Sequence, residues 1–249
     1  MCIRDSFPAP LAEMLRQVAA FPPAPSTVDS AGDLPGGYGN TTRGEGVRRG
    51  IGYGVGIKNI CFSEGFDDYS TARVRLEVVA GAAVATVHTA AAEVGQGLIT
   101  LQQQIARTEL GVETVTIRPA DTSVGSAGSS SASRQSYMSG GAVKMACEAV
   151  RAAVAQRMGR TAVQLIGGKV IADGTVADLV DVLGDEPVEE TTVFRHRPTV
   201  PLDPTTGQGN SHVQLALCVH RATVDVDVEL GLIKVVELAA VQDLSLIHI

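Results

Sequence analysis

Two hydrophobic periodicities, one of two residues and one of about 3.6, alternate in the middle of this 249-residue chain. The shorter period is typical of half-buried strands and the longer one of amphipathic helices. In chain order these patterns predict a β-hairpin at 73–91, a helix at 98–110, a strand at 113–118 and a helix at 137–157. This order favours an α+β fold over a doubly wound parallel sheet.

A second group of strands is expected near the end of the chain. Residues 213–219, 222–229 and 232–240 alternate in the same way and predict an antiparallel run with a turn at 229–231. We expect these strands to share one domain with the hairpin at 73–91, with the two predicted helices packed against them.

The region before the first strands is rich in loop signals. A short helix is expected at Leu11–Ala20, and the prolines that follow it interrupt any regular element. We therefore expect residues 1–45 to be a connecting segment and residues 46–249 to be one domain. The strings MCIRDS (1–6) and LSLIHI (244–249) resemble translated adapter sequence, so we expect them to be foreign and the domain to be incomplete at both ends.

Composition excludes several classes of protein. The formal net charge of −7 argues against a nucleic-acid surface, which normally shows a basic patch. No apolar run reaches the ~18 residues of a membrane helix, and the first twenty residues do not read as a secretory signal. The four cysteines form no CxxC pair, which indicates neither a zinc site nor a disulfide framework. These features predict a cytoplasmic protein.

Gly95-Gln96-Gly97 lies between a predicted strand and a predicted helix. Glycines allow close approach of a backbone to a ligand, and the helix start offers N–H groups and a positive dipole end to an anion. Gln96 adds a donor and an acceptor on one side chain. The alternative is an ordinary strand-to-helix turn.

Residues 125–136, here called the serine loop, contain six serines and lead into the second predicted helix. Hydroxyl and N–H groups there could cradle a polar or phosphate-bearing ligand, with Arg134 balancing its charge. The alternative is a flexible linker, although linkers between a strand and a helix are usually short. We expect Gln96 and Ser130–Ser136 to meet at one site.

Other chemistry is not indicated by the sequence. No P-loop, GxGxxG or GxSxG motif occurs, and the five histidines show no metal-ligand spacing. His88 is expected to be a packed or hydrogen-bonded strand residue. Glu64, Asp67 and Asp68 are expected to form a polar turn.

Two stretches together carry a family resemblance: VHTAAAEVGQGLITLQQQIARTELGV and PADTSVGSAGSSSASRQSYMSGGAV. They resemble the molybdopterin-binding subunit of the xanthine dehydrogenase and aldehyde oxidase family. The stretches GIGYGVGIKNICFSEGFDDYSTARVRLE, HRPTVPLDPTTGQG and HRATVDVDVELGLIKVVELAAVQD are similar, more narrowly, to the molybdenum subunit of bacterial xanthine dehydrogenase. The resemblance covers residues 8–243 and implies a molybdenum-cofactor-binding domain.

The resemblance implies an oxidoreductase that hydroxylates purines, converting hypoxanthine or xanthine to urate with water as the oxygen source. Its cofactor is molybdenum bound to molybdopterin, extended by a cytosine dinucleotide in many bacterial members. Electrons leave through 2Fe-2S centres to FAD, so an iron–sulfur subunit and an FAD subunit are the implied partners. Related subunits act on aldehydes, other N-heterocycles or carbon monoxide, and a non-catalytic anion-binding module is a further alternative.

The family's cofactor contacts can be carried onto this sequence residue by residue. They fall on two segments, Gly95, Gln96 and Gly97 in the first and Ser130, Ser131, Ala132, Ser133, Gln135 and Ser136 in the second. Ala132 is expected to lie nearest the metal. The family's catalytic glutamate belongs to a GxGE motif that this chain lacks, so no catalytic residue and no metal ligand is assigned, and the isolated chain is expected to be inactive.

Overall fold

The computed structural model describes residues 10–25 and 30–243. These residues divide into two compact units. The middle unit is Asn59–Val213, and the terminal unit combines the residues up to Lys58 with those from Gln214 onward. The terminal unit therefore draws its strands from both ends of the sequence.

The middle unit contains a four-stranded sheet with the order β4-β3-β2-β8. Its strands are β2 (Tyr69–Val79), β3 (Ala82–Thr89), β4 (Thr114–Arg118) and β8 (Val188–Arg195). The β2–β3 hairpin and the β2–β8 pair are antiparallel, whereas β3 and β4 are parallel and are joined through helix α3 (Leu98–Leu110). The carboxyl ends of β3 and β4 consequently lie at the same edge of the sheet.

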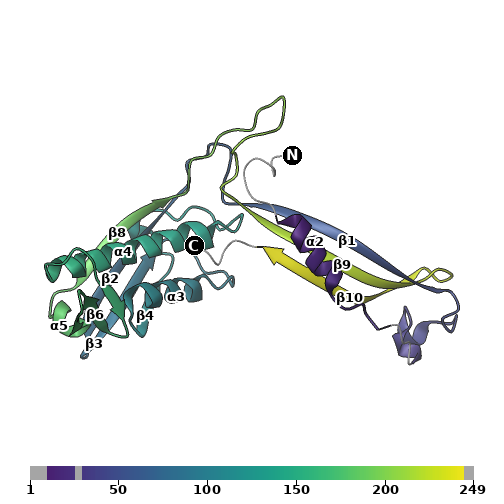
Figure 1. Cartoon of the computed structure of the whole chain (residues 1–249), viewed down its shortest axis with the longest axis horizontal. Coiled ribbons are helices and arrows are strands. Elements are labelled where there is room, and N and C mark those ends of the chain that lie inside the picture. Colours follow the sequence, from purple (N-terminus) through teal and green to yellow (C-terminus); the bar gives the residue numbers. More distant parts are fainter. Residues whose placement is uncertain (1–9, 26–29, 244–249) are drawn as a thin grey trace. The chain divides into compact units, whose positions relative to one another are not determined.

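Helices α3 and α4 (Gly140–Arg157) pack on one face of this sheet (Figure 1). The alternation predicted from the sequence puts the apolar residues on that face, where Val74, Leu76 and Val87 are fully buried. Gly141 allows α4 to approach β8 closely, because a Cβ at this position would lie 2.9 Å from the Phe194 ring. Burial of these apolar surfaces is the main term that stabilises the unit.

The helix predicted at 137–157 begins as a π-helical segment, Gln135–Ser139, that continues into α4. After α4 the chain forms a small antiparallel sheet that the sequence did not predict, and then a short helix. These elements are β5 (Gln164–Ile166), β6 (Lys169–Ala172), β7 (Thr175–Asp178) and α5 (Leu179–Leu183). The strands of this sheet are too short for a two-residue period to be recognised.

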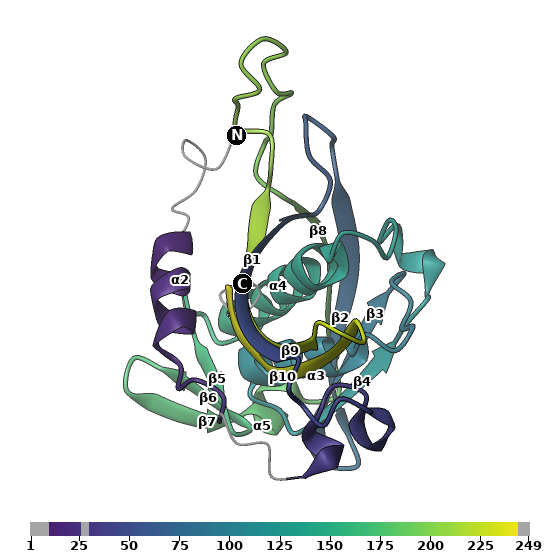
Figure 2. The same ribbon diagram turned by 90° about the vertical axis from the view of Figure 1, so that its right-hand side faces the viewer.

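The terminal unit is a three-stranded sheet of order β1-β9-β10, with helix α2 (Leu11–Ala20) packed on β9 and β10. The strands β1 (Val47–Ile60), β9 (Gln214–Asp227) and β10 (Leu232–Asp243) follow one curved path (Figure 2). The expected strands 213–219 and 222–229 are in fact one strand, because the alternation continues through His220 and Arg221.

The 73–91 hairpin and the 213–241 strands, expected to share one domain, lie in different sheets and in different compact units of the structure. The strands 214–227 and 232–243 pair with each other and with β1 in the terminal unit, and they form no sheet with the hairpin. Hydrophobic alternation identifies a strand and its buried face, but it does not identify the partner strand.

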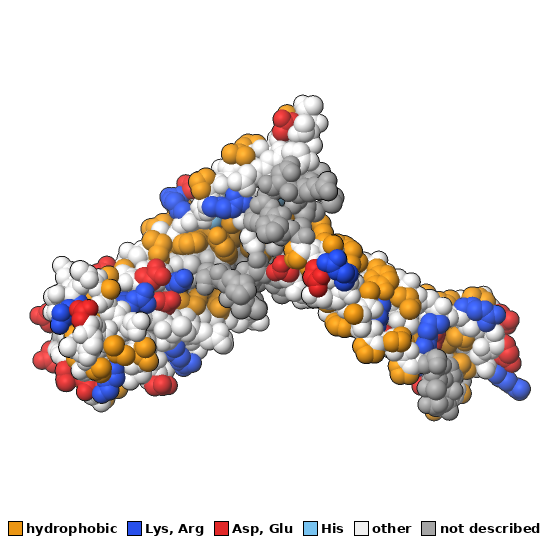
Figure 3. All heavy atoms as spheres, in the orientation of Figure 1, with side chains coloured by type: hydrophobic (Ala, Val, Ile, Leu, Met, Phe, Trp, Pro, Cys, Tyr) orange, Lys and Arg blue, Asp and Glu red, His pale blue; other side chains and the backbone are white. Residues whose placement is uncertain are grey.

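Both outer strands of the terminal unit expose apolar side chains. On β1, Ile51, Tyr53 and Val55 are each at least half exposed, and on β10, Ile233 and Val235 are more exposed still. Figure 3 shows hydrophobic side chains gathered along this unit. Large exposed apolar patches on proteins mark surfaces that contact other proteins, membranes or ligands. Among the described residues, no helix is both long and apolar enough to cross a membrane.

Asp227 ends β9 and holds the preceding loop in place. Its carboxylate accepts hydrogen bonds from Thr42 Oγ1 at 2.5 Å, from Asn40 Nδ2 at 2.8 Å and from the backbone N–H groups of Glu229 and Leu230 at 3.0 Å. The hydroxyl of Thr42, followed by the Asn40 amide, lowers the Asp227 pKa from 3.8 to about 2. This carboxylate therefore connects the loop before β1 to the β9–β10 turn.

We expect acid to weaken the terminal unit between about pH 4 and pH 2. A carboxyl group with a lowered pKa in the folded state adds stability above its ordinary pKa of 3.8, and that contribution is lost as pH falls towards about 2. Thermal unfolding followed by circular dichroism from pH 6 to pH 2 measures the effect. Asp227→Asn should lower the melting temperature at pH 6 and have little effect at pH 2. Equal effects at both pH values would contradict the assignment.

Candidate functional site

Two loops meet at the edge of the sheet where the parallel strands β3 and β4 end. One is residues 90–97, between β3 and α3, and the other includes the serine loop, between β4 and the helix that begins at Gln135. They line one cavity of about 310 Å³. Its lining residues are Val94, Gln96 and the complete run Ser130–Ser136. Ligands of sheets with parallel strands bind at this kind of edge.

Glu93 organises the first loop from within. Its carboxylate accepts hydrogen bonds from the backbone N–H groups of Gly95 at 2.7 Å, Gly97 at 3.2 Å and Ile99 at 3.0 Å. These backbone hydrogen bonds, that of Ile99 above all, lower the pKa of Glu93. The N–H groups at the start of α3 therefore already have a carboxylate of their own chain as acceptor, and these donors are not free as the sequence predicted.

The side chain of Gln96 is also held by its own loop. Its Oε1 accepts from the Val94 N–H at 2.6 Å, and its Nε2 donates to the Ala92 carbonyl at 3.0 Å. One Nε2 hydrogen and one Oε1 lone pair are left for a ligand. Gly95 and Gly97 have positive φ angles of 99° and 78° and flank Gln96 without lining the cavity.

The serine loop offers donors that the first loop does not. Among the described residues, no acceptor contacts the backbone N–H groups of Ser133, Gln135 and Ser136, which lie at the start of a helix. Ala132 and Ser133 adopt positive φ angles of 51° and 54°, which side chains rarely tolerate. The loop thus holds a strained backbone that presents unpaired amides beside the cavity.

Two side chains of this segment differ from what the sequence predicts. Arg134 is fully buried and its guanidinium pairs with Asp68, so it is not available to balance the charge of a ligand. Gln135 donates from Nε2 to the Ser129 carbonyl at 3.3 Å, and its Oε1 accepts from the Ser139 hydroxyl. Gln135 braces the loop with its side chain and has only its backbone N–H for a ligand.

The remaining candidates are structural. Asp68 is buried against Arg134, so the expected polar turn at Glu64, Asp67 and Asp68 is wrong for Asp68. His88 is hydrogen-bonded as expected, with its Nδ1 2.7 Å from Asp121 Oδ2. The described part of the chain contains no group of three or more histidine, cysteine or acidic side chains able to hold a metal ion.

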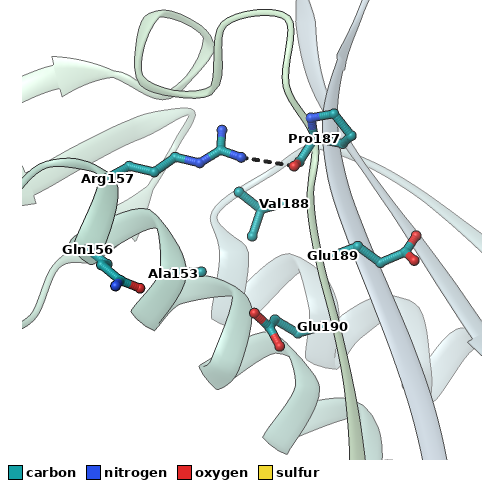
Figure 4. A pocket seen from close by; sticks show the side chains of 7 residues that line it. All are labelled: Ala153, Gln156, Arg157, Pro187, Val188, Glu189 and Glu190. Carbon is teal, nitrogen blue, oxygen red and sulfur yellow. Dashed lines mark hydrogen bonds between the residues drawn. The ribbon is translucent and has the colours of Figure 1, made fainter.

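A second cavity, of about 360 Å³, lies beside the end of α4 in the middle unit. Arg157 lines it and donates to the carbonyl oxygens of Leu183, Glu186 and Pro187, so its guanidinium braces the chain before β8 (Figure 4). The carboxylate of Glu189 points away from Arg157 and lies 3.6 Å from Arg75. Arg157 and Glu189 of this cavity therefore serve local contacts.

The sequence matches the model of the molybdopterin cofactor-binding domain family over residues 37–247. The chain belongs to this family. Solved structures that it resembles confirm the expected α+β fold of a molybdenum-cofactor-binding domain, since the TM-scores of five of them lie between 0.55 and 0.59. None of the proteins with curated function matches the sequence.

Three of the similar structures define the extent of the likeness. CO dehydrogenase from Oligotropha carboxidovorans is 16% identical, with a TM-score of 0.58 over 94% of this chain and 28% of the compared chain. Aldehyde oxidoreductase from Desulfovibrio gigas is 26% identical, with a TM-score of 0.55 over 80% and 20%. Quinoline 2-oxidoreductase from Pseudomonas putida 86 is 22% identical, with a TM-score of 0.57 over 81% and 28%. This member of the molybdopterin cofactor-binding domain family spans 20–28% of the length of these structures.

Glu93 gives a direct test of how the Gln96 loop is held. In Glu93→Ala, the amides of Gly95, Gly97 and Ile99 lose their acceptor, and their hydrogen exchange should become roughly tenfold faster. Exchange measured by NMR or mass spectrometry reports the change. Glu113→Ala, at an exposed residue beyond the other end of α3, is the control and should leave these amides unchanged. Unaltered protection in Glu93→Ala would remove the carboxylate from this role.

Proposed function

We propose that this chain supplies cofactor-binding surface of a molybdenum hydroxylase and that its ligand is the pterin of the molybdenum cofactor. The observation that carries the proposal is the single cavity lined by Gln96 and Ser130–Ser136, in a chain of the molybdopterin cofactor-binding family. The two loops come from separate strand–helix connections, yet both follow strands of one parallel pair.

The donors at the cavity fit such a ligand. Unpaired backbone N–H groups and the hydroxyls of Ser133 and Ser136 suit the polar edges and the phosphate of a pterin, and the small side chain of Ala132 leaves room beside them. The groups that would hold the cofactor are those of Gln96, Ser130, Ser131, Ala132, Ser133, Gln135 and Ser136, and Gly95 and Gly97 would shape the turn that presents Gln96.

The cavity residues bind and orient; they do not transfer protons. Arg134 is the charged residue among those that line the cavity, and its guanidinium already donates hydrogen bonds to Asp68 and to backbone carbonyls. When bound, the cofactor supplies the molybdenum centre at which a substrate carbon is oxidised with water as the oxygen source. The chain's own contribution is to hold the pterin through the amides of the serine loop and through Gln96.

For the complete subunit we propose purine hydroxylation of the xanthine dehydrogenase type, in the cytoplasm. The support is the similarity of 50–77 and 196–209 to that type, and the partners would be an iron–sulfur (2Fe-2S) subunit and an FAD subunit. The solved structures it resembles are named for carbon monoxide, aldehydes and quinoline, so these substrates form the competing set. The cofactor would carry a cytosine dinucleotide, as in many bacterial relatives.

Cofactor retention tests the proposal. Gln96→Ala in the full-length parent subunit removes one or two hydrogen bonds to the pterin, and we expect a roughly tenfold loss of cofactor affinity. Molybdenum per protein by elemental analysis and pterin by fluorescence after oxidation measure it, with folding checked by circular dichroism. A parent protein that purifies with neither molybdenum nor pterin, yet binds inorganic phosphate, would instead support an anion-binding module. Full occupancy in Gln96→Ala would remove Gln96 from the site.

A further inference from the structure

The serine loop is built around the guanidinium of Arg134. The Nε donates to Asp68 Oδ2 at 2.8 Å, and Nη2 donates to Asp68 Oδ1 at 2.6 Å and to the Tyr69 carbonyl at 3.1 Å. Nη1 donates to the carbonyl of Ala127 and, at 3.0 Å, to that of Ser129. Every one of the five N–H donors of this fully buried side chain has an acceptor.

The loop follows the outline of this group closely. Gly128 has a φ of +62°, and a Cβ there would lie 2.7 Å from Nη1 of Arg134. Ala132 and Ser133 are held at positive φ, a conformation that persists only where surrounding contacts enforce it. The Ala132 carbonyl is fixed by the Cys61 N–H at 3.0 Å. A segment of serines and glycines has few apolar anchors of its own, so these contacts determine its shape.

We propose that Asp68 and Arg134 are positioning residues that set the serine loop in its ligand-binding conformation before a ligand binds. Asp68 precedes β2 and Arg134 precedes α4, so the pair attaches the loop to the sheet and to the helix at once. Their charges cancel internally, and the cavity is left with amides and hydroxyls as its donors. The proposal rests on the proposed function only for the identity of the ligand.

Hydrogen exchange of the complete chain separates this role from general stabilisation. Arg134→Lys keeps the charge, but an ammonium group cannot reach all the acceptors of the planar fork. The hydrogen-bonded amides that report on the loop are that of residue 134, which donates to the Ser131 carbonyl, and that of Cys61, which donates to the Ala132 carbonyl. We expect these two amides to exchange roughly tenfold to a hundredfold faster, over and above any change shared by β2 and α3. A uniform loss of protection across the middle unit would mean that the pair serves only overall stability, and would overturn the proposal.

Gly128→Ala provides a second variant that leaves every charge in place. Its Cβ would collide with the guanidinium, so the same amides should lose protection. Gly81→Ala is the matched control, because Gly81 has a φ of +81° in the β2–β3 turn with open space around it. Unchanged exchange of the amides of residue 134 and Cys61 in both Arg134→Lys and Gly128→Ala would overturn the proposal. If Arg134→Lys does not fold, Gly128→Ala against Gly81→Ala decides.

Pterin retention by the parent subunit is measured separately and tells the two proposals apart. If the substitutions speed loop exchange but the wild-type parent holds no pterin, the positioning role stands and the proposed ligand is wrong. If the parent holds pterin but neither substitution changes loop exchange, the proposed ligand stands and the positioning role is wrong. When both hold, Gly128→Ala should lose pterin and Gly81→Ala should retain it.

Discussion

Asp68→Ala is expected to lower the free energy of unfolding of the middle unit by about 3–5 kcal/mol, because it leaves a buried guanidinium without its carboxylate. A domain is typically stable by only about 5–15 kcal/mol, so this single change removes a large part of the total. Urea unfolding followed by circular dichroism, with unchanged slope, measures the loss.

Asp67→Ala is the matched control for this experiment. Asp67 is the neighbouring carboxylate and pairs with Arg195 at an exposed position, where an ion pair contributes about 0–1 kcal/mol. If both variants unfold at the same urea concentration, the buried Asp68–Arg134 pair contributes no more to the free energy of unfolding than the exposed Asp67–Arg195 pair.

Ala132→Phe is expected to abolish cofactor retention by the parent subunit, with an affinity loss of more than roughly a hundredfold. A phenyl ring at this position enters a cavity of about 310 Å³ that is lined by the neighbouring serines. Molybdenum and pterin content per protein, with circular dichroism as the check on folding, measure the effect.

Ala80→Phe is the control that distinguishes loss of cofactor through filling of the cavity from loss through strain in the backbone. Ala80 and Ala132 share a φ of 51°, so a phenylalanine meets the same backbone restriction at either residue. Ala80 is exposed in the β2–β3 turn and does not line the cavity. Retention of cofactor by Ala80→Phe together with loss by Ala132→Phe is the expected pair of results; equal retention by both would place Ala132 outside the site.

Periodicity predicted most elements of the fold and missed those in which it is weak. Strand β1 was not predicted, because glycines occupy every second position around Ile51, Tyr53 and Val55. The alternation of glycines with larger apolar residues is nevertheless a strand signal. The pairing of β1 with β9 joins the two ends of the sequence, and nothing in either segment alone specifies it. Local patterns therefore predicted the elements, and long-range pairing required the structure.

The candidate site shows the same division. The glycine and serine motifs identified both loops, but the partners of Glu93 and Arg134 were not predicted. A carboxylate two residues before a GxG sequence is a recognisable signal for a side chain that binds the loop's own N–H groups, as Glu93 does. The contact between Arg134 and Asp68 has no such signal, because its partners are distant in sequence and meet only in the folded sheet.

The separation of 66 residues between Asp68 and Arg134 also bears on how the site is assembled. The two residues meet only where the intervening β2, β3, α3 and β4 are folded, so the serine loop takes its shape together with the sheet. Closing so long a stretch of chain carries an entropic cost that the loop's own contacts must offset. We therefore expect the shape of the loop, and ligand binding with it, to be lost when the sheet of the middle unit unfolds.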